Sequence, residues 1–339
     1  MANCVKVKMK EAERLRQKII AEGVFDPSFV PLREGEFVFF AVKKAPKGMR
    51  AAKKELMPRQ RKFASVQDAL SGKLSAKEAE ELVRSFDVIG DVAIVEVPAG
   101  LEKREKEIAG AVMDVHRNVK AVAKKMGPME GEFRVRRLKI IGGEKRTETL
   151  YKEHGVKMKV DLATAYFSPR LAFERGRIAG EVKSGESVLA MFAGVGPFPL
   201  VIARKKPLAK IAAVELNPDA MKFMKENVKL NRLGGSITPI FGDVRKVVPK
   251  RFTNWADRII MPHPTGAHEF LHDAFIAAKK NAVVHFYTFG KIAKKYEDAK
   301  RIVKDAAKKE RRKVKIISCR TVRPYAPGVD QVVVDFKAL

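Results

Sequence analysis

The feature that most constrains this chain is a regular alternation of short apolar segments with helical ones in its C-terminal half. Seven apolar segments of strand length begin at Glu186, and they read ESVLAMF, KIAAVEL, SITPIF, ADRIIM, NAVVHFYTF, KVKIISC and QVVVDF. Most are separated by stretches with helical periodicity, such as PDAMKFMKENVKLN and KKYEDAKRIVKDAAKK. Strands that alternate with helices are typical of a doubly wound, largely parallel sheet. We therefore expect an α/β domain over residues 162–339.

A small basic module is expected at the N-terminus. A basic, helix-like stretch runs from Val5 to Glu22, and the apolar run from Glu36 to Val42 is typical of a strand. The segment from Lys43 to Lys62 is basic, contains two prolines and a glycine, and has few large apolar residues, as a linker would. We place the first domain at residues 1–57.

A second α+β unit is expected from residue 63 to residue 161. Its segments SAKEAEELVRSF and REKEIAGAVMDVHRNV have helical patterns, while DVAIVEVP and FRVRRLKII are typical of strands. The sequence contains no internal repeat and no low-complexity tract. Three domains are reasonable for 339 residues, because single cores usually stop growing below that length.

The charge of the chain points to a polyanionic partner. Sixty-nine Lys and Arg against 40 Asp and Glu leave a formal net charge of +29, spread over the whole length. Nucleic acid binding explains this excess better than a lysine-rich surface adapted to heat or salt, which is the alternative. The chain has no apolar run of about 20 residues and no signal peptide, so we expect a cytoplasmic protein without a membrane partner. Cys4 and Cys319 are too few for a disulfide framework or a four-thiolate zinc site.

A glycine turn follows the first strand of the predicted sheet. Gly194 and Gly196 lie in FAGVGPFP and allow the backbone to turn tightly beneath a ligand at the carboxyl edge of the sheet. The next strand ends at Glu215, whose carboxylate could accept hydrogen bonds from both hydroxyls of a ribose. Asn217 and Pro218 are suited to the N-cap and the first helical position. Glycine turns after strands occur in many folds, but this combination favours an adenosine-containing cofactor.

Two prolines distinguish between the cofactors that share this arrangement. A dinucleotide needs backbone N–H groups for its pyrophosphate at the helix N-terminus, where this chain has Pro197 and Pro199. S-adenosylmethionine carries no phosphate and loses nothing there. The third strand ends in FGDV, so Asp243 either accepts from an adenine amino group or only caps a turn.

Three segments of the chain read AYFSPRLAFERGRI, FAGVGPF and VELNP. Together they resemble the archaeal and eukaryotic tRNA (guanine(37)-N1)-methyltransferases, in particular the archaeal type with an extra N-terminal domain. The likeness continues through SFDVIGDVAIVEVP, GEFRVRRL, DRIIMPHPTGAHEFL and RPYAPGVDQVVVDF, and it is weakest over the first 60 residues. It implies a class I, Rossmann-like methyltransferase sheet with two smaller N-terminal α+β domains. It also implies S-adenosyl-L-methionine as cofactor, tRNA as substrate, and roles in RNA recognition for residues 63–161 and in tRNA binding for residues 1–57.

Methyl transfer to guanine N1 needs a base for the N1 proton and a donor for the charge that develops at O6. The resemblance implies Glu174 as the base and Arg134 as the donor, with Arg170 helping to shape the site. Arg170 and Glu174 are four residues apart, so an ordinary ion pair on one helix face is the alternative. The cofactor-binding residues are then Phe192, Gly194, Gly196, Glu215, Asn217, Asp243 and Pro262. The substrate-binding residues are Tyr166, Pro262, His263 and Pro264, and the mechanism requires no metal.

Two positions depart from the family pattern. Ala190 stands where an aspartate is common in the glycine motif, and MPHP replaces a loop that commonly contains asparagine. His263 and His268 could be taken for a metal pair or a base, but packing beside a nucleobase is favoured because no further ligands cluster near them. Trp255 and the run FVFF are expected in the core, and the basic cluster from Lys308 to Lys315 fits either a solvated helix end or an RNA contact.

Several alternative functions remain at this stage. Relatives that transfer the aminocarboxypropyl group in wybutosine synthesis have a Ser-Gly-Asn type of sequence where Ser168 to Arg170 stand here, so the intact SPRLAFE favours methyl transfer. A bifunctional enzyme that also methylates the tricyclic wybutosine precursor is a second alternative. A non-catalytic RNA-binding protein is a third, and Pro197 and Pro199 argue against a nicotinamide oxidoreductase. We expect a monomer that contacts the anticodon loop and the elbow of tRNA without an obligate protein partner.

Overall fold

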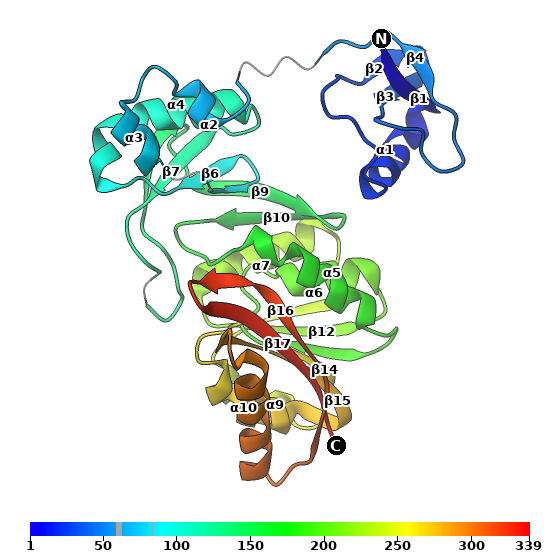
Figure 1. Cartoon of the computed structure of the whole chain (residues 1–339). Coiled ribbons are helices and arrows are strands. Elements are labelled where there is room, and N and C mark those ends of the chain that lie inside the picture. Colours follow the sequence, from blue (N-terminus) through cyan, green and yellow to red (C-terminus); the bar gives the residue numbers. More distant parts are fainter. Residues whose placement is uncertain (59–62, 83–84, 130) are drawn as a thin grey trace. The chain divides into compact units, whose positions relative to one another are not determined.

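The computed structural model describes residues 1–58, 63–82, 85–129 and 131–339. The chain divides into two compact units, Met1–Ala69 and Leu70–Leu339, each with its own core (Figure 1). The predicted boundaries of three domains, at 1–57, 63–161 and 162–339, stay predictions. No helix within the described ranges is long and apolar enough to cross a membrane.

The first unit is a small sheet with one long helix. The strands β1 (Ala2–Lys8), β2 (Leu32–Glu34), β3 (Phe37–Ala41) and β4 (Ala52–Lys54) lie in the order β2-β3-β1-β4, and the 3-10 turn η1 (Met9–Glu11) leads into α1 (Ala12–Ala21). The run FVFF belongs to β3, with Val38 and Phe40 buried in the core, as expected. Helix α2 (Val66–Ala69) ends the unit.

Two expectations for this first unit are wrong. The stretch from Val5 to Glu22 is not helical from its start, because residues up to Lys8 alternate between the two faces of β1 and pair with β3. The segment from Lys43 to Lys62 is not simply a linker, since Ala52–Lys54 forms β4 and pairs with β1. In both cases pairing within the sheet overrides the local preference of a basic segment. Residues 59–62 of the expected linker lie outside the described residues.

The second unit begins with a small α+β layer. Its strands β5 (Asp87–Ile89), β6 (Val92–Val95), β7 (Ala121–Lys125) and β8 (Leu138–Gly143) form a sheet in that order, with α3 (Ala76–Glu81), η2 (Ala99–Arg104) and α4 (Glu105–Val115). A capping box between Ser75 and Glu78 starts α3. The expected helix over 75–86 ends at Glu81, and its positions 83–84 lie outside the described residues. The expected strand over 133–141 begins only at Leu138.

The seven predicted strands of the C-terminal half are confirmed as one seven-stranded sheet. An antiparallel pair, β9 (Glu148–Glu153) and β10 (Val156–Asp161), precedes it. The large sheet contains β11 (Ser187–Ala190), β12 (Lys210–Glu215), β13 (Ile237–Phe241), β14 (Ala256–Met261), β15 (Ala278–Lys291), β16 (Val314–Ala326) and β17 (Val329–Ala338). Their order is β13-β12-β11-β14-β15-β17-β16. The first five strands are parallel, and β17 and β16 are antiparallel to their neighbours.

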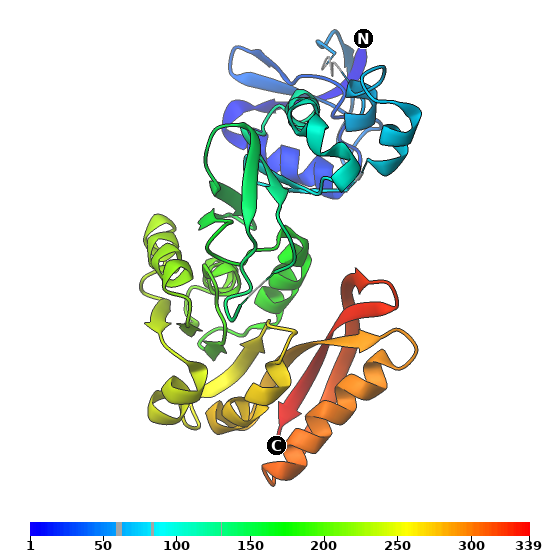
Figure 2. The same cartoon turned by 90° about the vertical axis from the view of Figure 1, so that its left-hand side faces the viewer.

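Helices cover both faces of the large sheet, which explains why its strands are apolar on both sides (Figures 1 and 2). One core lies under α8 (Val244–Arg251), η4 (Ala267–Phe270), α9 (Leu271–Ala277) and α10 (Lys295–Lys309). The other lies under α5 (Ala172–Glu181), α6 (Pro197–Lys205) and α7 (Pro218–Leu230). Trp255 packs against the first of these cores, as expected.

The strand order also fixes where a ligand can bind. The chain runs outward from β11 through β12 to β13, and it then returns to the other side of β11 to form β14 and β15. Loops that follow β11 and β14 therefore leave the sheet in opposite directions and open a crevice at the carboxyl ends of the strands.

Candidate active site

A cavity of about 1030 Å³, including its open mouth, lies at this carboxyl edge. Most of its lining comes from the ends of β11 to β15, from residues 132–134, and from β16. The lining residues are Glu132, Phe133, Arg134, Tyr166, Phe192, Gly194, Val214, Glu215, Leu216, Asn217, Ala220, Gly242, Asp243, Val244, Arg245, Pro262, His263, Pro264, Phe270, Phe289, Arg323 and Tyr325.

The glycine turn contributes Phe192 and Gly194 to the cavity wall, whereas the predicted cofactor residue Gly196 is not one of the wall residues. Gly194 has a φ of +58°, Gly196 has a φ of +89°, and even Phe192 adopts a positive φ of +54°. Such angles are strained for a residue with a Cβ atom, and strain of this kind is concentrated at functional sites. Gly196 is the N-cap of α6, whose first and third residues are Pro197 and Pro199. This helix start therefore lacks two of the N–H groups that would bind a pyrophosphate.

Glu215 is held beneath this turn by backbone groups. Its Oε2 accepts from the N–H of Gly194 at 2.6 Å, and its Oε1 accepts from the N–H groups of Leu216 and Asn217 at 2.9 and 2.7 Å. Burial raises the pKa of the Glu215 carboxyl, although these three bonds oppose that shift. The carboxylate is thus fixed in orientation at the end of β12, with lone pairs left to accept from a ligand's hydroxyl groups.

Asn217 and Asp243 are helix caps that also line the cavity. The Asn217 side chain accepts from the N–H of Asp219 at 2.9 Å at the start of α7, as expected, and donates to the carbonyl of Thr164 at 2.8 Å. Asp243 caps α8 and also forms an ion pair with Arg245, with 2.7 Å between Oδ2 and Nη2. Asp243 therefore has the capping role that the sequence suggested as one alternative. Because it also lines the cavity, a contact with an adenine amino group stays a proposal.

Arg134 and the loop after β14 form another part of the cavity wall. Arg134 donates from Nη1 to the hydroxyl of Thr265, which ties the loop around residue 134 to the large sheet. Pro262, Pro264 and Tyr166 also line the cavity. The remaining predicted substrate residue, His263, packs on Phe192, with ring centroids 5.4 Å apart.

His263 is suited to packing rather than to proton transfer. Burial, and to a smaller degree the charge of Arg134, lower the pKa of its imidazole below the usual range. The ring therefore stays neutral at neutral pH. It lies beside the ring of Phe192, and the expected packing beside a nucleobase stays a prediction.

Two predicted catalytic residues do not line the cavity. The guanidinium of Arg170 donates to Asp87 at 2.8 Å on β5. Glu174 is only 2% exposed, and its Oε2 accepts from the hydroxyl of Tyr287 at 3.0 Å and from Arg177 Nη2 at 2.8 Å. The alternative of an ion pair between Arg170 and Glu174 is wrong, because Arg170 lies in the 3-10 turn η3 (Pro169–Leu171) and only Glu174 lies in α5.

Glu174 nevertheless lies one step behind the cavity wall. Its partner Tyr287 precedes the wall residue Phe289 by two positions on β15, so both side chains project from the same face of the sheet. Two residues of a strand span about 6.8 Å. The carboxylate would therefore have to leave its present partners and turn toward Phe289 to reach a ligand in the cavity.

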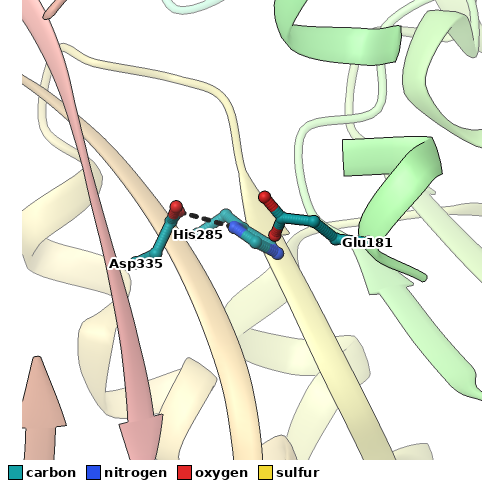
Figure 3. A group of neighbouring side chains, drawn as sticks. All are labelled: Glu181, His285 and Asp335. Carbon is teal, nitrogen blue, oxygen red and sulfur yellow. Dashed lines mark hydrogen bonds and ion pairs between the residues drawn. The ribbon is translucent and has the colours of Figure 1, made fainter. Parts of the chain in front are cut away.

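A buried polar network stabilises this region (Figure 3). His285 Nδ1 lies 2.6 Å from Asp335 Oδ1, and Arg177 Nη1 lies 2.7 Å from Asp335 Oδ2. Burial alone would raise the pKa of Asp335, but the hydrogen bond from His285 and the charge of Arg177 hold it well below the usual range. Burial lowers the pKa of His285, so this histidine is neutral and Asp335 is charged.

The same network contains a group with the composition of a metal site. Glu181, His285 and Asp335 bring their ligand atoms within 4.8 Å of one another (Figure 3). However, Nη1 of Arg258 lies 2.7 Å from His285 Nε2, and Arg177 binds Asp335. Two guanidinium groups hold the lone pairs that a cation would need, so this donor set does not suit a metal ion.

Several wall residues were missed by sequence reasoning. Arg245 and Phe270 follow β13 and β14, and Phe289, Arg323 and Tyr325 come from the long strands β15 and β16. The segment RPYAPGVDQVVVDF was noted only for its resemblance. In this segment the basic Arg323 and the aromatic Tyr325 stand just before a turn. This combination is the signal in the sequence that could have identified β16 as part of the site.

The two departures from the family pattern are structurally mild. Ala190 is 2% exposed at the end of β11, and it lies in the apolar core on the α5–α7 side of the sheet rather than in the cavity. In MPHP the prolines themselves, Pro262 and Pro264, form part of the wall.

Family models match nearly the whole chain. The TRM5/TYW2 methyltransferase domain matches residues 149–317, the TYW2 N-terminal domain matches residues 66–147, and the tRNA methyltransferase 5 N-terminal domain matches residues 4–50. A tRNA (guanine(37)-N(1))-methyltransferase Trm5b from Pyrococcus abyssi is 40% identical over 337 residues, which cover 99% of each chain. The chain belongs to the TRM5/TYW2 methyltransferase family. The predicted fold, with its Rossmann-like sheet and additional N-terminal domains, is thereby confirmed.

Solved structures of this methyltransferase family agree with the fold. The crystal structure of Trm5b from Pyrococcus abyssi is 39% identical, with a TM-score of 0.74, and covers 100% of this chain and 99% of its own. A complex of aTrm5 and tRNALeu is 31% identical, with a TM-score of 0.72, over 99% of both chains. A Methanocaldococcus jannaschii TYW2 in complex with AdoMet is 30% identical, with a TM-score of 0.58, and covers 75% of this chain and 99% of its own.

Proposed function

We propose that this enzyme transfers a methyl group from S-adenosylmethionine to N1 of the guanosine at position 37 of tRNA. The observation that carries the proposal is the composition of the cavity. Its wall contains Gly194 of the glycine turn and Glu215 together with Arg134 and the His263 loop. Relatives similar over the full length of the chain are named for this reaction. The two halves of the reaction, a cofactor and a purine acceptor, therefore have room in one cavity.

The glycine side of the cavity fits the cofactor. In this proposal Glu215 accepts from the ribose hydroxyls, Gly194 allows close approach of the cofactor to the backbone, and Asp243 accepts from the adenine amino group. The fixed Glu215 carboxylate and the places of Gly194 and Asp243 in the wall support these roles, while Gly196, which is not a wall residue, contributes through the turn. We assign Phe192, Asn217 and Pro262 to cofactor binding as well, because they line the same cavity. When bound, S-adenosylmethionine supplies an electrophilic methyl group on a sulfonium. The protein's part is to hold the acceptor in line with that group.

A second group of wall residues suits a flipped guanine. Arg134 is placed to donate to O6, where negative charge develops as the N1 proton leaves. Tyr166, His263, Pro262 and Pro264 provide flat, largely apolar surfaces for a purine, as base-flipping enzymes do. Backbone carbonyls of the MPHP loop can accept from the guanine amino group in place of the absent asparagine.

We propose Glu174 as the base that removes the N1 proton. Its position behind Tyr287 and Phe289 requires the carboxylate to rotate toward the cavity when RNA binds. Arg170 then acts indirectly, since its bond to Asp87 connects the start of α5 to the small sheet that carries the Arg134 loop. Arg170 is thus a positioning residue in this proposal.

The remaining parts of the chain fit an RNA substrate. The net charge of +29 favours phosphate contacts that offset the few kcal/mol needed to flip a base. We assign residues 63–161 to recognition near the anticodon, and residues 1–57 to a distant part of tRNA such as the elbow. A relative of similar length is known in complex with tRNALeu. Action in the cytoplasm as a monomer stays a prediction.

A wybutosine-pathway activity is the second candidate. An aminocarboxypropyltransferase from Methanocaldococcus jannaschii is 36% identical over 254 residues, which cover 74% of this chain and 97% of its own. The present chain differs in the match of residues 4–50 to the tRNA methyltransferase 5 N-terminal domain and in its Ser168-Pro169-Arg170 sequence. Both differences favour methyl transfer.

One assay distinguishes these functions. The full-length enzyme is incubated with labelled S-adenosylmethionine and an unmodified tRNA transcript that carries guanosine at position 37, and with a matched adenosine transcript. We expect 1-methylguanosine in the digest of the first transcript only. Aminocarboxypropyl or methyl labelling that appears only with a tricyclic precursor would support the second candidate, and the absence of cofactor binding in calorimetry would support a non-catalytic RNA-binding protein.

A further inference from the structure

Among the wall residues of the cavity that receive no role in the function proposed above, three lie on the long strands of the sheet. Phe289 lies on β15, and Arg323 and Tyr325 lie on β16, at the end of the sheet where the antiparallel strands extend. We refer to Phe289, Arg323 and Tyr325 as the strand wall.

The register of the sheet sets Phe289 and Arg323 in one row. Strand β17 lies between β15 and β16, and its Gln331 is paired with Phe289 on one side and with Arg323 on the other. Directly opposed residues project from the same face of a sheet, so the three side chains are neighbours. Gln331 is 1% exposed, and its Oε1 accepts from Arg323 Nε at 2.8 Å. The guanidinium is therefore held in a fixed orientation by its inner nitrogen.

A β-bulge brings Tyr325 over the same row. The pairing of β16 with β17 shifts register between Pro324 and Ala326, so Tyr325 has no partner on β17. Its ring lies on the ring of Phe289, two strands away, with centroids 4.0 Å apart and an interplanar angle of 33°. Tyr325 is 44% exposed. Bulges that redirect a side chain in this way are common next to active sites.

The strand wall also carries an uncompensated charge. Three arginines line the cavity, and Arg245 is neutralised by Asp243. Arg134 and Arg323 have no carboxylate within ion-pair distance among the described residues, and the terminal nitrogens of Arg323 make no hydrogen bond with them. A half-buried guanidinium without a carboxylate partner favours an anionic ligand, because the loss of its hydration is otherwise not compensated.

We propose that the strand wall binds a second nucleotide of the RNA, next to the acceptor guanosine. Its base stacks on Tyr325, which Phe289 supports from behind, and its phosphate binds the terminal nitrogens of Arg323. Aromatic faces stack on any base, and guanidinium groups bind phosphate through two parallel hydrogen bonds. This inference rests on the proposed function, because it takes the cavity as the place where RNA is modified.

Tyr325→Ala and Arg323→Gln in the full-length enzyme test the proposal, with Tyr325→Phe as the matched control that keeps the ring. Binding of the guanosine-37 tRNA transcript is measured by fluorescence anisotropy at several salt concentrations, and S-adenosylmethionine binding is measured by calorimetry. We expect Tyr325→Ala to weaken RNA binding about 5- to 150-fold, as loss of one base stack does, and Tyr325→Phe to bind like the parent. Arg323→Gln should lower the slope of log K against log salt by about one, with cofactor affinity unchanged.

Two results would overturn the proposal. If Arg323→Gln weakened cofactor binding and left RNA binding intact, the guanidinium would bind the methionine carboxylate instead. If Tyr325→Ala and Tyr325→Phe bound RNA equally well, the ring would be only structural. RNA binding is measured without turnover, so the two proposals can fail separately. If the parent enzyme did not methylate guanosine 37 but still needed Tyr325 to bind RNA, the proposed reaction would be wrong and the nucleotide site would stand. Thermal unfolding of each variant confirms that it is folded.

Discussion

Replacement of Glu174 by glutamine is the most direct test of the proposed chemistry. The amide keeps the shape of the side chain but has no charge and cannot take the N1 proton. General base catalysis by a positioned side chain contributes about 10²- to 10⁴-fold to a rate. No atom of Glu174 lines the cavity, so the affinity for S-adenosylmethionine should not change. We expect a single-turnover methylation rate on the guanosine-37 transcript reduced by this factor.

The cost of Glu174→Gln to stability can be estimated from its neighbours. Removing one partner of a buried ion pair costs about 3–5 kcal/mol when the other charge is left uncompensated. Arg177, however, keeps Asp335 and Glu181, each with an oxygen 2.7–2.8 Å from Nη1. Arg320, whose side chain is 34% exposed, retains contact with water. We therefore expect a loss of about 1–3 kcal/mol in the free energy of unfolding, measured with denaturant.

Tyr287→Phe separates the two effects. This variant keeps the carboxylate of Glu174 and removes only the hydroxyl that binds it, which should cost about 1 kcal/mol of stability and leave the methylation rate within a few-fold of the parent. If Glu174→Gln turned over at the parent rate, Glu174 would not be the base. If Tyr287→Phe were as slow as Glu174→Gln, the loss would come from a disturbed structure rather than from missing proton transfer.

Four further predictions concern other parts of the molecule. Arg134→Gln should lower kcat about 10²- to 10³-fold with unchanged cofactor affinity, and an unchanged kcat would reject its role at O6. Gly194→Ala, at a φ of +58°, should lose about 1–2 kcal/mol of stability and weaken calorimetric cofactor binding, whereas Gly235→Ala, with open space around it, should do neither. The His263 ring should titrate below pH 6.5 in NMR, and its pKa should rise in Arg134→Gln. The contribution of this histidine to stability should be complete above pH 6.5 and should be lost as the pH falls through its lowered pKa. Deletion of residues 1–57 should leave cofactor binding intact and weaken tRNA binding, and unchanged kinetics on full-length tRNA would contradict the role given to this segment.

The sequence by itself determined the elements of the large sheet and its ligand-binding edge. The segments around Val188 and Val284 are apolar throughout, because helices cover both faces of the sheet. This run of apolar residues can be recognised in the sequence without knowledge of distant contacts. Gly194 and Glu215 could be assigned to one site from the sequence, because the carboxyl ends of adjacent parallel strands lie at the same edge of the sheet. The basic composition likewise indicated the class of partner.

Only the tertiary structure decided which side chains meet in the cavity. Four-residue spacing suggested that Arg170 and Glu174 share a helix face, but the 3-10 turn before α5 and the partners Asp87, Tyr287 and Arg177 separate them. Asp87 and Tyr287 come from distant strands that local periodicity cannot reveal, whereas Arg177 lies on α5 itself, three residues after Glu174.

The first unit and the strand wall show the same limit. Residues 4–8 become part of a strand because they pair with β3, and those of β4 because they pair with residues 2–4, although β4 alone is basic and has little apolar character. Tyr325 reaches Phe289 through a bulge whose position depends on the register of β16 against β17. Local sequence fixes an element when its own burial pattern suffices, whereas register and long-range pairing decide which residues form the site.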